Sequence, residues 1–243
     1  MHSHAIVQEI DRTLPQTPRS EGGGSLLAMV GLPGAGKSYL VQHLLRRVPA
    51  TVLTTDRIRR IVREQPTYSA AEMAWIYELC YRTMERRLSL GERVVFDASN
   101  YLALRRERLV EIAARHDVPL ALCCVQASEA VTRQRLLRRV QGRRSPGDAS
   151  DAGWSVYRRM LEAQEPVILP HLFLDTSHTP VDILAERLHD YWMHQEESHR
   201  HLNDTQTLHK CADLHKRADL HKSGDLHAGA GDGSGQGRLD RRK

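Results

Sequence analysis

The sequence of 243 residues is poor in aromatic side chains and contains no long apolar run. Aromatic residues make up 5% of the chain and only two are Phe, so the core must rest on Leu, Val, Ile and Ala. The longest apolar runs, Leu26–Val30 and Pro119–Val125, are far shorter than the roughly 18 residues of a membrane-spanning helix. Met1–Asp11 has no apolar signal-peptide segment. These absences predict a soluble, cytoplasmic protein.

Cysteine is also scarce, and its spacing excludes the usual cysteine-based sites. None of the four cysteines forms a C-x-x-C pair or any other metal-ligand spacing; they are Cys80, Cys123, Cys124 and Cys211. Cys123 and Cys124 are adjacent within an apolar run, which is typical of buried, reduced thiols. We therefore expect neither a disulfide framework nor a zinc site.

The chain has no strong excess of one charge outside its C-terminal part. The formal net charge is +5, but residues 199–243 hold nine Lys or Arg and six Asp. The remaining 198 residues carry 26 basic and 24 acidic side chains, a net charge of +2. The body of the chain thus lacks the charge excess of a protein that binds a long polyanion. The charge count does not exclude a local basic patch.

Composition divides the chain into three parts. Residues 1–24 are polar and contain Pro15, Pro18 and Gly22–Gly24, so we expect a flexible leader. Residues 25–198 have the mixed composition of one globular domain. In residues 199–243 a Leu-His pair recurs every six residues, and six of the chain's fourteen His lie there. That spacing fits no heptad, and a low-complexity, disordered tail is expected.

Within residues 25–198, short apolar runs alternate with helical stretches, which predicts βαβ units and an α/β fold with a five-stranded, mainly parallel sheet. The expected strands are Leu26–Val30, Thr51–Thr54, Val94–Asp97, Leu120–Val125 and Leu172–Leu174. The expected helices are Lys37–Arg47, Ala70–Leu90, Ala103–His116, Glu129–Val140, Ala152–Gln164 and Val181–Glu196. Sites in such sheets lie beyond the carboxyl ends of the strands.

The first expected strand runs into Gly31-Leu32-Pro33-Gly34-Ala35-Gly36-Lys37-Ser38, which matches the phosphate-loop pattern G-x-x-x-x-G-K-[ST]. Glycines let consecutive N–H groups face phosphates, and the following helix adds its positive N-terminal end. Lys37 would reach the β and γ phosphates, and Ser38 would ligate Mg²⁺. The sequence thus predicts a site for ATP and Mg²⁺. The expected nucleotide-binding residues are Gly31, Pro33, Gly34, Ala35, Gly36, Lys37, Ser38 and Tyr39.

Other segments favour a kinase among the phosphate-loop proteins. No Asn-Lys-x-Asp segment for guanine is present, and the domain is small for a remodelling ATPase. A kinase needs a group that orients or deprotonates the acceptor hydroxyl, cations for the transferred phosphoryl group, and a cover that excludes water.

Asp56 and Arg59 are the first candidates for these roles. They are three residues apart after the second strand, so they share a face if a helix begins there. Asp56 could accept the acceptor's proton, and Arg59 could hold an anionic group of the acceptor. An N-capping Asp with a solvated Arg explains the spacing equally well.

Asp97 and an arginine cluster are the remaining candidates. Asp97 ends a buried strand, the usual way to deliver a carboxylate to Mg²⁺; it could also orient Arg59 or the acceptor, or cap the next helix. Six arginines lie between residues 133 and 144, where small kinases have their lid. We expect Arg135 and Arg138 to be catalytic, with a solvated helix face as the alternative.

Together these segments resemble the polynucleotide-kinase-like and zeta-toxin-like small P-loop kinases. The resemblance rests on Gly31–Ser38, Thr55–Arg59, Phe96–Asn100 and the arginines from Arg135 to Arg138. Asp148–Ala152 and Gln164–Pro166 are similar to a bacterial subgroup of predicted kinases. The resemblance implies a three-layer P-loop NTPase fold with a helical lid. It also implies that Asp56 is the general base, that Arg59 contacts the acceptor and that a lid arginine stabilises the transition state.

The sequence therefore predicts an ATP-dependent kinase that transfers the γ-phosphate to an acceptor hydroxyl. The balanced charge of the body favours a small molecule over a nucleic-acid 5′-hydroxyl end as acceptor. The alternative is a regulatory P-loop ATPase or nucleotide-binding switch without a phosphoryl acceptor. That alternative explains the phosphate loop equally well, but it explains Asp56, Arg59 and the lid arginines less well.

Overall fold

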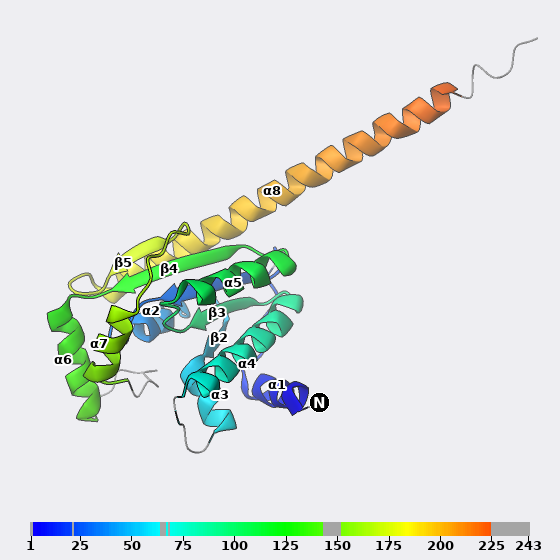
Figure 1. The fold of residues 1–243 in the computed structure, drawn as a ribbon. Coiled ribbons are helices and arrows are strands. Elements are labelled where there is room, and N and C mark those ends of the chain that lie inside the picture. The colour runs from blue at the N-terminus through cyan, green and yellow to red at the C-terminus, as the bar shows by residue number, and fades with distance from the viewer. Residues whose placement is uncertain (1, 21, 64–66, 68, 143–151, 225–243) are drawn as a thin grey trace, which may run out of the picture. The chain divides into compact units, whose positions relative to one another are not determined.

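The computed structural model describes residues 2–20, 22–63, 67, 69–142 and 152–224 (Figure 1). The chain divides into two units, residues 1–199 and 200–243. The first unit contains the whole sheet and every predicted site residue. The strands are β1 (Ser25–Val30), β2 (Thr51–Thr54), β3 (Arg93–Asp97), β4 (Leu120–Gln126) and β5 (Leu172–Asp175). The helices are α1 (His2–Thr13), α2 (Lys37–Leu44), α3 (Thr55–Val62), α4 (Ala70–Ser89), α5 (Ala103–Arg115), α6 (Glu129–Val140), α7 (Trp154–Glu162) and α8 (Val181–Gly224).

The five strands form one sheet in the order β2-β3-β1-β4-β5, and every neighbouring pair is parallel. The predicted five-stranded α/β fold is confirmed, and the sheet is entirely rather than mainly parallel. All six residues of β1 are buried because this strand lies at the centre with both faces covered. The chain leaves β1 for one side of the sheet and returns to the other for β4, so the carboxyl end of β1 lies at the switch point where α/β proteins bind ligands.

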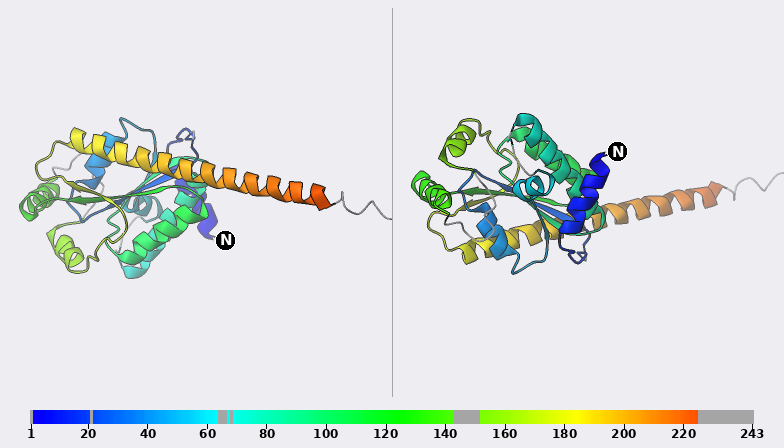
Figure 2. Two further views of the ribbon diagram at one scale, coloured as in Figure 1. Left: turned by 90° about the horizontal axis from the view of Figure 1, so that it is seen from above. Right: turned by 90° about the horizontal axis from the view of Figure 1, so that it is seen from below.

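Two apolar clusters cover the two faces of the sheet, as Figure 2 shows for its helices. One cluster joins alternate strand residues such as Ala28 and Phe96 to α1, α4 and α5. The other joins Leu27 and Val95 to α2 and to the first turns of α8, where Trp192 is fully buried. Successive side chains of a strand point to opposite faces of the sheet, so each apolar strand contributes residues to both helical layers.

Residues 1–24 differ from the expected flexible leader. Residues 2–13 form α1, and Val7, Ile10 and Leu14 are buried in the same cluster as α4. Their spacing of three and four residues places them on one helical face, so burial of that face orders the segment. This apolar face is short, and the polar residues between its members and the nearby Pro15 and Pro18 made the segment resemble a flexible leader in the sequence.

The C-terminal part also differs, because α8 continues to Gly224 where a disordered tail was expected from residue 199. Residues 225–243 lie outside the described part of the chain. None of the described helices combines the length and apolarity needed to cross a membrane. Cys80 and Cys123 are buried free thiols, whereas Cys124, which was expected to be buried like Cys123, is only partly buried. Burial raises the pKa of all three thiols, that of Cys124 to about 11.

Candidate functional site

The phosphate loop begins at the carboxyl end of β1, where Gly31 is held against β4. Gly31 has a φ of +150°, and a Cβ at this position would lie 2.3 Å from the Val125 carbonyl oxygen. The Gly31 N–H donates to the Ser99 carbonyl at 2.9 Å, which ties the loop to the segment after β3. Only glycine fits this close approach of backbone to backbone.

Gly34 and Gly36 give the loop its curvature. Their φ angles are +83° and +95°, in the left-handed region that favours glycine. Gly36 is the N-cap residue of α2, and no side chain caps the first turn of that helix. A helix that begins at a glycine without a side-chain cap is the kind of N-terminus that binds anions, as the phosphate-loop prediction requires.

Lys37 crosses the mouth of the loop. Its Nζ donates to the carbonyl oxygens of Gly31 at 2.8 Å and Leu32 at 3.1 Å. Ser38 follows in the first turn of α2 and is partly exposed. Tyr39 is 41% exposed and turns toward His43, with ring centroids 4.8 Å apart. Lys37 and Ser38 thus lie in the predicted cradle, whereas the Tyr39 ring packs along α2.

Asp56 and Arg59 lie on one face of α3, and the structure brings a third group to them. The Arg59 Nη1 donates to Asp56 Oδ1 at 2.6 Å, and its Nε donates to Glu72 Oε1 at 3.0 Å. The Arg59 Nη2 contacts Met73 Sδ at 2.8 Å. Arg59 is 3% exposed, so the guanidinium is a buried bridge between two carboxylates.

The structure differs from the sequence interpretations in the surroundings of Arg59 and in the residue that caps α3. Arg59 is not solvated, and Asp56 does not cap the helix, because the N-cap is Thr54, whose hydroxyl oxygen accepts from the Arg57 N–H at 3.0 Å. The guanidinium fork that was expected to grip the acceptor is instead bonded to side chains of the protein. In this arrangement Arg59 orients Asp56.

Glu72, which the sequence interpretation missed, holds the other end of the bridge. Its Oε2 accepts from the Thr67 N–H at 2.7 Å and from the Thr67 hydroxyl at 2.6 Å. These hydrogen bonds and the nearby Arg59 hold the pKa of the Glu72 carboxyl below its ordinary value. The S-x-x-E spacing of Ser69 and Glu72 marks the start of α4, but Glu72 bonds Thr67 instead of the N-cap N–H.

Asp97 occupies the last position of β3, in register with Thr54 of β2, and is buried. Because all strands are parallel, β1, β2 and β3 deliver the phosphate loop, Asp56 and Asp97 to the same edge of the sheet. Asp97 belongs to the strand directly beside β1, and Asp56 follows the next strand out.

Asn100, three residues after Asp97, is a further polar group at this edge. It has a φ of +45°, and its side-chain Nδ2 donates to the Met29 carbonyl at 2.8 Å. The Asn100 carbonyl in turn accepts from Arg106 Nη1 at 3.0 Å. Asn tolerates the left-handed region better than other non-glycine residues, which explains its place at this turn. Asn100 therefore fixes the turn after β3 to β1.

Arg135 on α6 contacts the phosphate loop from the other side. Its Nη1 donates to the Gly34 carbonyl at 3.1 Å and to the Thr176 hydroxyl at 2.8 Å. The Thr176 hydroxyl donates to the Ala35 carbonyl at 2.7 Å. Partial burial lowers the pKa of the Arg135 guanidinium. Thr176, which follows β5 and which the sequence interpretation did not include, is thus bonded to the loop both directly and through Arg135.

The other lid arginines have different surroundings. Arg138, the second expected catalytic arginine, is exposed on α6, whereas Arg139 Nη1 donates to the Ala152 carbonyl at 3.0 Å. Arg143 and Arg144 lie outside the described residues. The structure therefore brings Arg135, but not Arg138, into contact with the loop.

A cavity of about 280 Å³ borders the phosphate loop beneath α7. Tyr157 and Leu161 of α7 line it together with Gln164, His171 and Phe173. Among the described residues that line it, none is Asp, Glu, Lys or Arg. Tyr157 also packs with Leu32 and Leu136 in a small apolar cluster, so α7 both covers the loop and lines this cavity.

The described part of the chain contains no group of three or more His, Cys, Asp or Glu placed to hold a metal ion. A cation bound at the phosphate loop would thus need ligands in addition to carboxylates and imidazoles. The Ser38 hydroxyl and the Asp97 carboxylate are hard oxygen donors of the kind Mg²⁺ prefers, and Mg²⁺ commonly completes its shell with phosphate oxygens and water. The donor set fits Mg²⁺ bound together with a nucleotide.

Comparison with known proteins agrees with this architecture. The family model described as "AAA domain" matches residues 26–167. No curated protein sequence matches the chain. The fold is similar to that of the APS kinase of Mycobacterium tuberculosis solved with AMPPNP and APS, with 19% identity and a TM-score of 0.55, over 72% of this chain and 98% of that one.

Two further solved structures have the same fold. Kti12 of Chaetomium thermophilum, solved with ADP-AlF3, is 17% identical with a TM-score of 0.55, over 69% of this chain and 99% of that one. A gluconokinase of Sinorhizobium meliloti is 19% identical with a TM-score of 0.51, over 74% of this chain and 97% of that one. At these identities the likeness concerns the fold.

Proposed function

Since the chain belongs to the AAA domain family, a P-loop kinase-like family whose model matches more than half of its length, we propose that residues 25–198 form an ATP-dependent kinase. The reaction is transfer of the γ-phosphate to a hydroxyl group of a small acceptor. The observation that carries this proposal is the juxtaposition of a complete phosphate loop with an arginine-oriented carboxylate, Asp56, at one edge of the sheet. Two of the similar solved structures are kinases of small molecules, APS kinase and gluconokinase, which supports the same reaction class.

In this proposal the phosphate loop binds the triphosphate of ATP. The N–H groups at the start of α2 face the phosphates, and Lys37 exchanges the carbonyls of Gly31 and Leu32 for phosphate oxygens. Ser38 and Asp97 hold Mg²⁺, which neutralises charge on the phosphates when bound. Arg135 keeps the loop in shape through the carbonyl of Gly34.

Asp56 is the proposed general base. Arg59 holds the carboxylate through Oδ1 at 2.6 Å, and the carboxylate so oriented would accept the proton of the acceptor hydroxyl. Arg59 itself is a positioning residue, because its guanidinium is buried and already bonded to Asp56 and Glu72. This assignment replaces the direct contact between Arg59 and the acceptor that the family resemblance implies.

The balanced charge of the body supports a small acceptor over a polyanion, because residues 1–198 carry 26 basic and 24 acidic side chains. The cavity at α7 adjoins Gly31 and is lined by residues of β4 and β5 such as Val125 and Phe173, so it borders the proposed triphosphate site on the side away from Asp56. Small hydroxyl compounds are the acceptors to test first.

The experiment is an acceptor screen that measures ADP release from ATP and Mg²⁺. We expect at least one small hydroxyl compound to stimulate ADP release by the wild type and none to stimulate release by the folded Lys37→Ala variant. Stimulation only by a 5′-hydroxyl oligonucleotide at low salt would refute the acceptor class. Slow turnover that no acceptor accelerates would refute the kinase and favour the regulatory ATPase or nucleotide-binding switch.

A further inference from the structure

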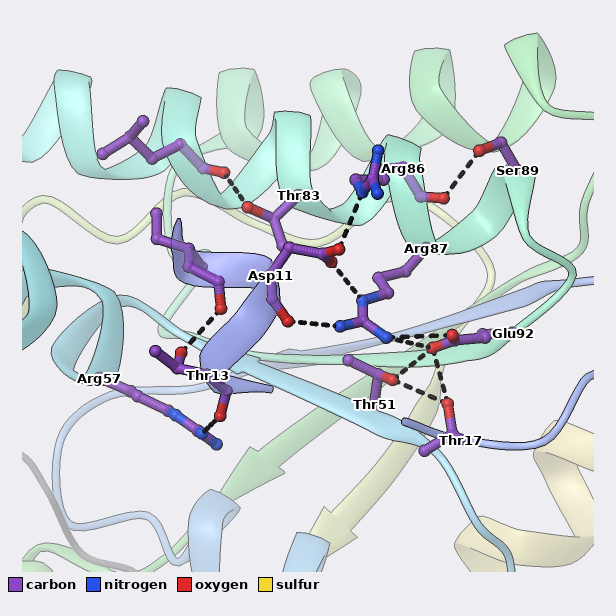
Figure 3. A network of polar contacts seen from close by, with 12 residues as sticks. Asp11, Thr13, Thr17, Thr51, Arg57, Thr83, Arg86, Arg87, Ser89 and Glu92 are labelled. Atoms are coloured by element: carbon purple, nitrogen blue, oxygen red, sulfur yellow. Dashed lines mark hydrogen bonds and ion pairs between the residues drawn. The ribbon is translucent and has the colours of Figure 1, made fainter. Parts of the chain in front are cut away.

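The N-terminal segment, residues 2–20, lies outside the residues that match the family model, yet it is bonded to the helices that carry Asp56, Arg59 and Glu72. Figure 3 shows the polar contacts that join it to α3, α4 and the sheet. Its apolar residues Val7 and Ile10 are buried beside α4 in the larger core cluster. A segment with this many interior contacts is part of the folded domain.

The contacts to α4 centre on Asp11. Its carboxylate pairs with Arg87 Nε at 2.6 Å and Arg86 Nε at 2.8 Å, and its carbonyl accepts from Arg87 Nη2 at 2.8 Å. Arg87 is buried and also pairs with Glu92 at 3.1 Å. Glu92 in turn accepts from the hydroxyls of Thr17 at 2.7 Å and Thr51 at 2.6 Å. Asp11 is thus held to α4, and Thr17 is held to the start of β2 and to Glu92.

The contact to α3 lies next to the proposed base. Arg57 Nη2 donates to the Thr13 carbonyl at 2.5 Å, so the last residue of α1 is bonded to the residue that follows Asp56. The segment therefore contacts both helices of the carboxylate-arginine bridge: α3 with Asp56 and Arg59, and α4 with Glu72.

We propose that residues 2–20 form a brace that fixes α3 against α4 and thereby holds Asp56 at the acceptor hydroxyl. Asp11 and Arg57 are its positioning residues. Neither touches the proposed triphosphate site, so the brace governs the acceptor side of the reaction and leaves nucleotide binding unaffected. The inference rests on the proposed role of Asp56, but the coupling of α1 to α3 is a property of the fold and has its own measurement.

The test compares the full-length wild type with Asp11→Asn, Arg57→Ala and Arg57→Lys. Glu9→Gln is the matched control, because Glu9 lies on α1 and pairs only with the exposed Arg12 among the described contacts. Amide hydrogen exchange over residues 55–62 and AMPPNP affinity are measured for each variant. Exchange in α3 should become about tenfold faster in Asp11→Asn and Arg57→Ala, from the usual worth of one hydrogen bond to a charged group. AMPPNP affinity should stay within about twofold, since neither change touches the phosphate loop.

Arg57→Lys, which keeps a cationic donor, should restore most of the protection, whereas Glu9→Gln should match the wild type. Once the screen has identified an acceptor, Asp11→Asn and Arg57→Ala should raise the KM for that acceptor or lower kcat about tenfold. The KM for ATP should stay unchanged. Unchanged α3 exchange in both variants would overturn the brace, as would faster α3 exchange with normal transfer. A wild type that transfers to no acceptor refutes the proposed kinase, while the exchange experiment still decides the coupling.

Discussion

Replacement of Glu72 by Gln tests the buried carboxylate-arginine bridge most directly, because it keeps the shape of the side chain and removes its charge. Glu72 accepts three hydrogen bonds, two from Thr67 and one from Arg59, and both Glu72 and Arg59 are almost fully buried. An amide can accept at only one of its two terminal atoms, so at least one donor loses its partner in the variant. Removal of one member of a buried ion pair costs about 3–5 kcal/mol. Asp56 still compensates part of the Arg59 charge, so we expect the lower end of that range.

The matched control is Glu78→Gln on the same helix. Glu78 pairs with Arg82 at 2.7 Å, but both side chains are nearly half exposed. Exposed pairs of this kind contribute about 0–1 kcal/mol. Urea denaturation of both variants at neutral pH should therefore separate them by about 2–3 kcal/mol in free energy of unfolding, from the difference between buried and exposed pairs. Equal losses would show that the bridge contributes no more than a surface pair and would refute its role in positioning Asp56.

Three further predictions concern the same site. Asp56→Asn should lower phosphoryl transfer about a hundredfold, the common size of a general-base effect, with AMPPNP affinity nearly unchanged; a parallel loss of affinity would instead place Asp56 at the metal. Gly31→Ala should destabilise the domain or abolish AMPPNP binding, since the new Cβ would lie 2.3 Å from the Val125 carbonyl oxygen. The control is Gly142→Ala, whose Cβ would have nothing within 4 Å. It should leave AMPPNP binding intact, although the φ of +76° at this position strains the backbone of the variant. The Glu72 pKa lies below its ordinary value of 4.5, so its contribution to stability is complete above that pH and is lost as the pH falls through the lowered value. The stability gap between wild type and Glu72→Gln, measured by urea denaturation, should therefore narrow as the pH falls below about 4.5.

The sheet was predictable because the strands are short, mostly apolar runs that end at glycine or polar residues. The expected Thr51–Thr54 has the observed bounds, and the other four strands differ by one residue at an end. The phosphate loop was predictable for a related reason: its glycines, lysine and serine are local requirements of one turn between a strand and a helix. Side-chain periodicity and turn chemistry are both readable over a few residues.

The partners of Arg59 were not predictable from local spacing. The sequence placed Asp56, three residues away, on the same helix face as Arg59. Glu72 belongs to the next helix, α4, and nothing in the sequence connects it to Arg59. The same reason explains why the helix in the N-terminal segment was not predicted: its three buried apolar residues pack against α4, and the sequence does not show that contact. Long-range pairing depends on how helices pack, and the one-dimensional pattern of either partner alone does not contain it.

The sheet order assigns different tasks to the two sides of the phosphate loop. The strands on one side of β1 bring Asp97 and Asp56, both carboxylates; those on the other side bring Arg135 with Thr176, whose bonds go to loop carbonyls. Carboxylates repel a triphosphate unless a cation or an acceptor proton lies between them, so the β2-β3 side suits the acceptor and Mg²⁺. An arginine that binds the carbonyls of Gly34 and Thr176 leaves the loop N–H groups directed to the phosphates, so the β4-β5 side suits the nucleotide. Substitutions at Asp56 and Thr176 should consequently separate acceptor-dependent transfer from nucleotide affinity.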